Sequence, residues 1–194
     1  MNDSLPPYSA QEVLDFWFGA QDAPGYGEAR AAWFQKDEAF DAEIQRKFGG
    51  LHAASSHGML DYFWKDSAPG NLALVLTLDQ FSRQLYRNDA KAFAQDAHAL
   101  ILAKHAIEQG FDKDALPVQR TFWYLPFEHS ENLEDQDRSI ELFKPLGNPE
   151  LTRYAEEHRA VIARFGRFPH RNAVLGREST PEEEAYLAQP GSGF

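Results

Sequence analysis

The stretch Leu72-Ala73-Leu74-Val75-Leu76 is one of the two longest continuous apolar runs in the chain. Pro69-Gly70 precedes it and predicts a turn, and Asn71 is placed to cap the helix that follows. The predicted helix extends from Leu72 to about Tyr86 and begins apolar on all sides, which is typical of a helix that runs through a core. We therefore expect a helical domain built around this segment.

Helix signals continue on both sides of this segment. Ser9 and Glu12 have the spacing of a capping box, and Phe40, Ile44 and Phe48 recur on one helical face. Later segments carry helix starts or apolar helical faces: Asp89, Pro117, Ile140 with Leu142 and Phe143, Asn148-Pro149, and Thr180-Pro181. No segment alternates with a period of two between hairpin turns. The sequence predicts an all-α protein of about seven to nine helices, with one domain over residues 1–188 and a loose tail over 189–194.

The apolar patterns also predict which helix faces are buried. The helix capped by Asp89 is expected to bury Phe93, Ala97, Leu100, Ile101 and Ile107. The helix after Asn148 is expected to bury Leu151, Tyr154, His158, Ile162 and Phe165. The tryptophans are expected in the core, or at an interface if they form an exposed patch: Trp17, Trp33, Trp64 and Trp123.

Composition excludes several kinds of function. The chain has 194 residues, no cysteine and a formal net charge of −11, so disulfides, zinc knuckles, iron–sulfur clusters and a catalytic thiol are ruled out. The acidic balance argues against a nucleic-acid or anionic-membrane surface. Met1–Pro7 carries no basic residue and no apolar run approaches the roughly 20 residues of a membrane span, so we expect a cytoplasmic protein. No metalloprotease, serine-hydrolase, nucleotide or dinucleotide motif is found, and neither a metal nor a cofactor is predicted.

Two polar clusters lie on or after predicted helices. Asp79 and Arg83 are four residues apart with the acid first, the order that favours an ion pair along a helix. Such a pair either fixes helix packing or belongs to a polar site. The second cluster, Glu128-His129-Ser130-Glu131, follows Pro126, whose ring disrupts helical hydrogen bonding. These side chains could move protons or bind a cation; alternatively, Ser130 or Asn132 caps the next helix.

A third polar cluster is rich in arginine. Six arginines and no lysine lie between Arg153 and Arg177, and two glutamates leave that segment at +4 while the rest of the chain carries −15. Arginine presents planar, paired donors that suit a carboxylate or a phosphate. The alternative is that this basic strip pairs with acids of the same chain. His158 falls on an apolar stripe, so a hydrogen-bonded core histidine is favoured over a catalyst.

Three stretches carry a family resemblance: 78–81 (LDQF), 124–131 (YLPFEHSE) and 165–172 (FGRFPHRN), the last continued by Leu175-Gly176-Arg177. With the start at 13–18 (VLDFWF), they resemble the bacterial domain-of-unknown-function family 924 over nearly the whole chain. The resemblance implies an all-helical, tetratricopeptide-like superhelical array of helical hairpins. It implies no established activity.

Three hypotheses about function follow. The first is a binding module whose polar clusters share one cleft for a small anion or an acidic peptide end. Its candidate ligand-binding residues are Asp79, Arg83, Glu128, His129, Glu131, His158, Arg164, Arg167, His170, Arg171 and Asn172. The second is an enzyme of undefined class, with His129 or His170 as the acid or base and Glu128 or Glu131 orienting it. The third is a structural or partner-docking protein in which the clusters only pack. The oligomeric state is left open.

Overall fold

The computed structural model describes residues 8–193, and these residues form two compact units. Unit 1 runs up to Arg87 and from Lys91 to Pro126, whereas unit 2 holds Asn88–Ala90 and the chain from Phe127 onward. Within residues 8–193 the regular elements are all helical, so the predicted all-α class is confirmed. The single domain expected over 1–188 stays a prediction. Met1–Pro7, whose lack of basic residues supports the expectation of a cytoplasmic protein, lies outside the described residues. The tail residue Phe194 also lies outside them.

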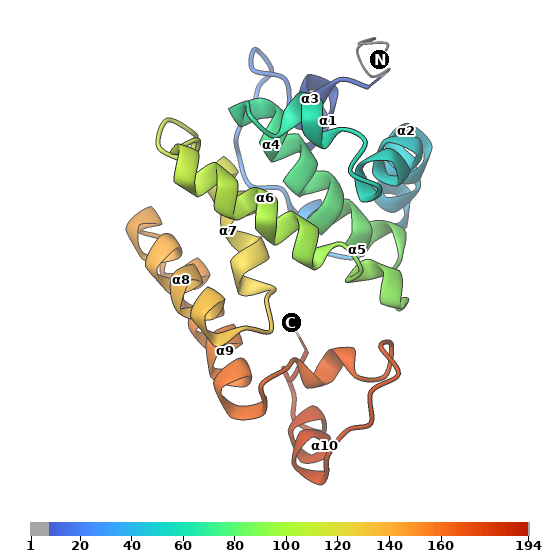
Figure 1. Ribbon diagram of the computed structural model, residues 1–194, viewed down its shortest axis with the longest axis vertical. Helices are drawn as coiled ribbons and strands as arrows, with labels where there is room; N and C mark the ends of the chain where they lie inside the picture. The colour runs from blue at the N-terminus through green and yellow to red at the C-terminus, as the bar shows by residue number, and fades with distance from the viewer. Residues whose placement is uncertain (1–7, 194) are drawn as a thin grey trace. The chain divides into compact units, whose positions relative to one another are not determined.

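Unit 1 is built around the apolar segment Leu72–Leu76. Figure 1 shows its helices, which are α1 (Ala10–Phe18), α2 (Glu38–Ser56), α3 (Asp61–Trp64), α4 (Ala68–Val75), α5 (Ser82–Leu85), α6 (Asp96–Gln109) and most of α7 (Pro117–Glu128). A π-helical segment, Leu76–Phe81, joins α4 to α5 without a break. The apolar residues from Leu72 to Phe81 are at most 2% exposed, which confirms a helix running through the core.

The start of this helix differs from the prediction. Ser67 is the cap, because its side chain accepts a hydrogen bond from the Gly70 amide, and the helix begins at Ala68. Pro69 is tolerated because the amides of a first helical turn have no intrahelical partner. Asn71 instead lies inside the helix. Its Nδ2 donates to the carbonyls of Lys65 and Leu102, and its Oδ1 accepts from the Trp123 indole at 2.9 Å.

Replacing Asn71 with leucine is expected to lower the free energy of unfolding by about 2–3 kcal/mol, because the buried Leu102 carbonyl and Trp123 N–H lose their partner. Urea denaturation followed by tryptophan fluorescence measures the loss. Asn148→Leu would not serve as a control, because Asn148 caps α9. The control is Gln109→Leu at the exposed end of α6. An equal effect of both substitutions would contradict the role of the Asn71 hydrogen bonds.

The buried face of α6 also differs from the prediction. The helix begins at Asp96 after a short 3₁₀ turn at Ala90–Ala92, and its buried residues are Ala99, Leu102, Ala103 and Ala106. Ala97 is exposed, and Ile101 is 66% exposed. The prediction weighted large apolar side chains, whereas the buried face of α6, a helix that packs against α4, consists mostly of small alanines.

Aromatic side chains fill the rest of the unit 1 core. The rings of Trp17 and Trp33 stack with their centroids 5.7 Å apart, and Phe122 meets both edge-on. Trp64 and Trp123 are buried as well, so the prediction of core tryptophans is confirmed.

Unit 2 contains a helical hairpin and a long loop that ends in a short helix. Its helices are α8 (Leu133–Phe143), α9 (Pro149–Phe165) and α10 (Pro181–Leu187). The side chains of Arg159 and Asp137 meet at 2.8 Å between α9 and α8. The buried residues of α9 are Ala155, His158, Val161 and Ile162, so His158 and Ile162 were placed correctly, whereas Tyr154 is 44% exposed. None of the helices in residues 8–193 is long and apolar enough to cross a membrane.

Candidate functional site

The predicted ligand-binding residues divide between the units. Asp79 and Arg83 belong to unit 1, and the other candidates belong to unit 2.

The unit 1 cluster is an ion-pair network in the core. Asp79 is fully buried, and its carboxylate lies 3.1 Å from Arg83 Nη1, which confirms the predicted pair. Arg83 also donates to both carboxylate oxygens of Asp96 on α6. Burial acts to lower the pKa of Arg83, but Asp79 and Asp96 outweigh it and the pKa is raised. The network therefore ties the central helix to α6, as the packing interpretation predicts.

Three arginines of the basic segment pair with glutamates of unit 2 that lie outside that segment. Arg164 meets Glu182 at 2.9 Å, Arg167 forms a two-pronged pair with Glu183, and Arg177 forms another with Glu131. The hydrogen bond from Arg167, supported by the Thr180 amide, lowers the pKa of Glu183 to about 2. These pairs join the end of α9 and the loop after it to α10 and to the start of unit 2. They are the contacts expected if the basic strip pairs within the chain.

Asn172 completes this loop framework. Its Nδ2 donates to Ser179 Oγ and to Glu183, and its Oδ1 accepts from Arg177 Nε at 2.9 Å. Asn172 is 1% exposed. Its amide therefore links the two arginine–glutamate pairs.

Phe168 is the centre of the loop. Gly166 ends α9 with a left-handed φ of 69°, a conformation that suits glycine, and the chain then turns so that the Phe168 side chain is completely buried. The ring lies 5.6 Å from the ring of His158 and 5.5 Å from that of His170, centroid to centroid. The Arg171 guanidinium lies 4.6 Å from the centroid of the same ring. One aromatic side chain thus holds two imidazoles and a cation together.

We call His129, His158, His170 and Arg171 the histidine–arginine cluster. Arg171 Nη2 donates to the His129 carbonyl at 3.1 Å. Burial lowers the pKa of His158 to about 3, and His129, His170 and Arg171 add to the effect. Burial also lowers the pKa of His170 to about 4, with Arg171 as the next cause. The imidazoles of His158 and His170 are therefore neutral near pH 7.

The acids of this neighbourhood have distinct positions. Glu131 accepts from the Phe168 amide as well as from Arg177, and its pKa is lowered because these bonds outweigh the opposing effect of burial. Glu128 Oε1 lies 3.4 Å from His158 Nδ1, which also contacts the Tyr154 carbonyl at 2.8 Å. The Glu128 and His158 side chains are 7% and 8% exposed. This imidazole–carboxylate pair is too enclosed to reach a substrate, so it does not favour the enzyme hypothesis.

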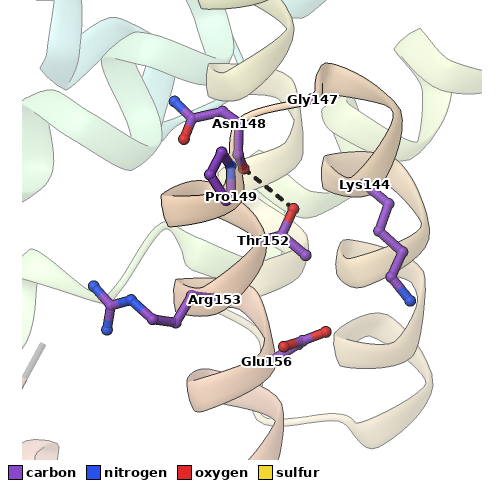
Figure 2. Close-up of a pocket in the computed structure, with 7 residues that line it drawn as sticks. All are labelled: Lys144, Gly147, Asn148, Pro149, Thr152, Arg153 and Glu156. Carbon is purple, nitrogen blue, oxygen red and sulfur yellow. Dashed lines mark hydrogen bonds between the residues drawn. The ribbon is translucent and has the colours of Figure 1, made fainter.

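A shallow groove of about 480 Å³ opens elsewhere in unit 2, where the turn after α8 meets the start of α9. Figure 2 shows the Glu156 side chain pointing toward the helix that carries Lys144 and the Arg153 side chain pointing to the opposite side of α9, while Lys144 extends along its own helix. Asn148 caps α9 here by accepting from the amides of Glu150 and Leu151. None of the predicted ligand-binding residues lines the groove. In the part of the chain that the structure describes, no group of three or more acidic or histidine side chains is arranged to hold a metal ion.

Sequence reasoning missed Phe168 as the centre of the loop and Glu183 and Arg177 as members of its framework. The spacing of Thr180 and Glu183 signals a capping box, which the structure contains. That local signal places the Glu183 carboxylate at the start of α10. It does not reveal that Arg167, 16 residues earlier, binds the same carboxylate.

The fold and the polar loop define an all-α protein whose second unit carries a buried aromatic residue surrounded by histidines and arginines. The chain belongs to a family described as bacterial proteins of unknown function, DUF924, whose model matches residues 13–191. It is similar to the solved structure of a protein of unknown function from Agrobacterium tumefaciens. The two are 41% identical, the match covers 92% of this chain and 96% of the other, and the TM-score is 0.83. The search of curated proteins found no match.

Proposed function

We propose that the protein is a binding module and that the histidine–arginine cluster of unit 2 takes a small anion or the acidic end of a peptide. The observation that carries this proposal is the convergence of His170 and Arg171 on the Phe168 ring, with the His129 carbonyl bound to the same guanidinium. A guanidinium and adjacent imidazoles are donors suited to carboxylate and phosphate oxygens.

The ion pairs of unit 2 exclude Arg164 and Arg167 from the proposed anion contacts. Arg164 and Arg167 each face a glutamate at 2.9 Å or less, so an anion at either position would compete with a carboxylate of the same unit. The proposed contacts are therefore His129 and His170, while Arg171, which is only 6% exposed, would favour the anion through its charge and not by direct contact. Glu131, Asn172 and Arg177 would act as positioning residues, because their hydrogen bonds fix the loop that carries His170.

The positive charge of Arg171 is a second observation that supports the proposed anion binding. The positive charge of Arg171 is one cause of the lowered pKa values of both His158 and His170. A bound anion would offset that charge and would raise the pKa of His170, since a nearby negative charge favours the protonated imidazole. Anion binding is therefore expected to strengthen as the pH falls from neutral toward the pKa of His170, about 4.

The test is an NMR titration of the histidine rings with and without inorganic phosphate. We expect phosphate to shift the ring signals of His170 and to raise its pKa, while the ring of His57, an exposed residue of unit 1, does not change. A His170→Asn variant should bind phosphate more weakly by about tenfold, the effect of losing one charge-assisted hydrogen bond. His57→Asn is the matched control.

Two results would count against the proposal. One is an unchanged His170 signal with phosphate and with acetate at concentrations far above physiological levels. The other is an equal loss of phosphate binding in the His170 and His57 variants. A thermal shift provides an independent check, because a ligand at 100 times its Kd stabilises the folded state by about 2.7 kcal/mol.

A further inference from the structure

The charged side chains around His170 limit the charge that the proposed anion site can hold. Arg171, Arg177 and Glu131 each act on the His170 imidazole. Arg177 and Glu131 form a two-pronged pair at 2.7 and 2.9 Å, so their effects on the imidazole largely cancel. Two positive charges and one negative charge leave a sum of +1 at His170. The imidazole itself is neutral near pH 7, because burial and Arg171 lower its pKa to about 4.

A second carboxylate lies beside His158 in the same cluster. Glu128 Oε1 is 3.4 Å from His158 Nδ1, and both side chains are almost fully buried, so water and salt screen their charges little. The His158 imidazole is neutral near pH 7 and does not offset the charge of Glu128. Arg171 binds the His129 carbonyl, and its charge opposes protonation of the His129 ring. The cluster therefore balances at most one negative charge.

The arginines that precede this cluster in the chain are matched by acids. Arg164 meets Glu182 at 2.9 Å, and Arg167 meets Glu183 at 2.6 Å. Each of these pairs is neutral as a whole, so neither adds to the positive charge at His170. A group with two negative charges, such as a phosphate or sulfate dianion, is typically held by several cationic donors. The described residues around His170 do not form such an arrangement.

The number of donors at the proposed contacts also matches a carboxylate. His129 and His170 are both partly exposed, so a ligand can reach them. The two nitrogens of an imidazole lie on different edges of the ring, so each ring turns a single N–H toward a ligand. Two rings thus supply two donors for the two oxygens of a carboxylate. A phosphate or sulfate group has more oxygens than this, and an oxygen that loses water without gaining a donor costs free energy.

We propose that the ligand of the histidine–arginine cluster carries a single negative charge and is a carboxylate, and that doubly charged phosphate or sulfate groups are disfavoured. The inference rests on the anion binding proposed above and names the class of anion. Phosphate near neutral pH contains both singly and doubly charged ions, so a different set of ligands is needed to test it.

The test is an NMR titration of the full chain near pH 7.5 with acetate, methanesulfonate and sulfate, followed at the His170 ring. Methanesulfonate and sulfate both place oxygens tetrahedrally around sulfur, but methanesulfonate carries one negative charge and sulfate carries two. We expect acetate to bind most tightly and sulfate most weakly, with a Kd for sulfate about tenfold above that for acetate, because the second charge of sulfate is not balanced. N-acetylglycine, which carries its carboxylate after a peptide bond, distinguishes a peptide end from a small acid by binding more tightly than acetate.

A charge variant provides a second measurement. Glu131→Gln removes the one negative charge among the three that act on His170, and the glutamine oxygen can still accept from the Phe168 amide. The Kd for sulfate should fall by about tenfold, while the Kd for acetate should change less. Glu182→Gln is the matched control, because it removes the same charge from an exposed acid that pairs with Arg164. Circular dichroism and thermal unfolding show whether each variant keeps its fold.

The possible outcomes separate this proposal from the proposed function. Tighter binding of acetate and methanesulfonate than of sulfate supports a singly charged ligand. A Kd for sulfate at or below that of either singly charged ion overturns it and leaves anion binding in place, since the His170 ring still responds. No response of the His170 ring to any of the three ions overturns the anion site itself. A folded Glu131→Gln variant with an unchanged Kd for sulfate shows that charge does not set the selectivity and also overturns the proposal.

Discussion

Alanine in place of Gly70 is expected to lower the free energy of unfolding by about 4 kcal/mol or to prevent folding, since overpacking against fixed atoms is among the costliest single changes. A Cβ atom at this position would overlap the Trp64 carbonyl oxygen and would lie 2.9 Å from the Trp64 Cα. Both atoms belong to the backbone at the end of α3, so relief requires moving α3 away from α4. Urea denaturation of the variant, or its yield as soluble protein, measures the effect.

Gly49→Ala is the matched control. Gly49 also lies inside a helix, α2, but a Cβ there would meet only the amide end of the Gln45 side chain, which is free to turn away. Alanine is expected to stabilise this position by up to about 1 kcal/mol, because glycine is the poorer helix former. Similar effects at Gly70 and Gly49 would show that helix propensity, and not the close approach of α3 to α4, determines the outcome.

Acidification is expected to destabilise the protein well above the pH at which its carboxylates titrate. The pKa values of His158 and His170 are lowered from 6.5 to about 3 and about 4. As the pH falls below 6.5, the unfolded chain binds a proton at each of these histidines and the folded chain does not. The stabilising contribution is therefore present above pH 6.5 and is lost as the pH falls toward the folded-state values. The loss is on the order of 1 kcal/mol for each pH unit and each histidine.

Urea denaturation at pH values between 6.5 and 4.5 tests this expectation, because Glu131 and Glu183, whose pKa values are lowered from 4.5, contribute their own loss only below that range. His158→Asn should make stability less dependent on pH in this window, and His57→Asn, at the exposed residue that follows α2, is the comparison. A flat stability curve for the natural protein down to pH 4.5 would show that His158 and His170 accept protons in the folded state.

Local signals in the sequence predicted the parts of the fold that depend on neighbouring residues. The starts of α7 at Pro117, α9 after Asn148 and α10 after Thr180 are confirmed, because a cap or a first-turn proline acts within three residues of itself. The core position of the central helix is confirmed as well, since a segment that is apolar on all sides has no polar face to turn toward water.

Residues far apart in the sequence determined the features of the fold that local signals did not predict. Ile101 was expected in the core, but α6 buries Ala99, Leu102, Ala103 and Ala106 instead, and which face of α6 is buried depends on the helices that pack against it. Asn71 was expected as a cap, but Trp123 and Leu102, far along the chain, give its amide a buried role.

The sequence by itself determined an all-α protein with a basic, histidine-bearing segment, because composition and helical periodicity are properties of the chain alone. Only the tertiary structure decided what that segment does with its charges. Arg177 pairs with Glu131, 46 residues earlier in the chain. The Arg171 guanidinium lies over the ring of Phe168, which also contacts the ring of His170. A guanidinium binds whichever carboxylate or ring the fold brings within reach, and sequence spacing does not specify that partner.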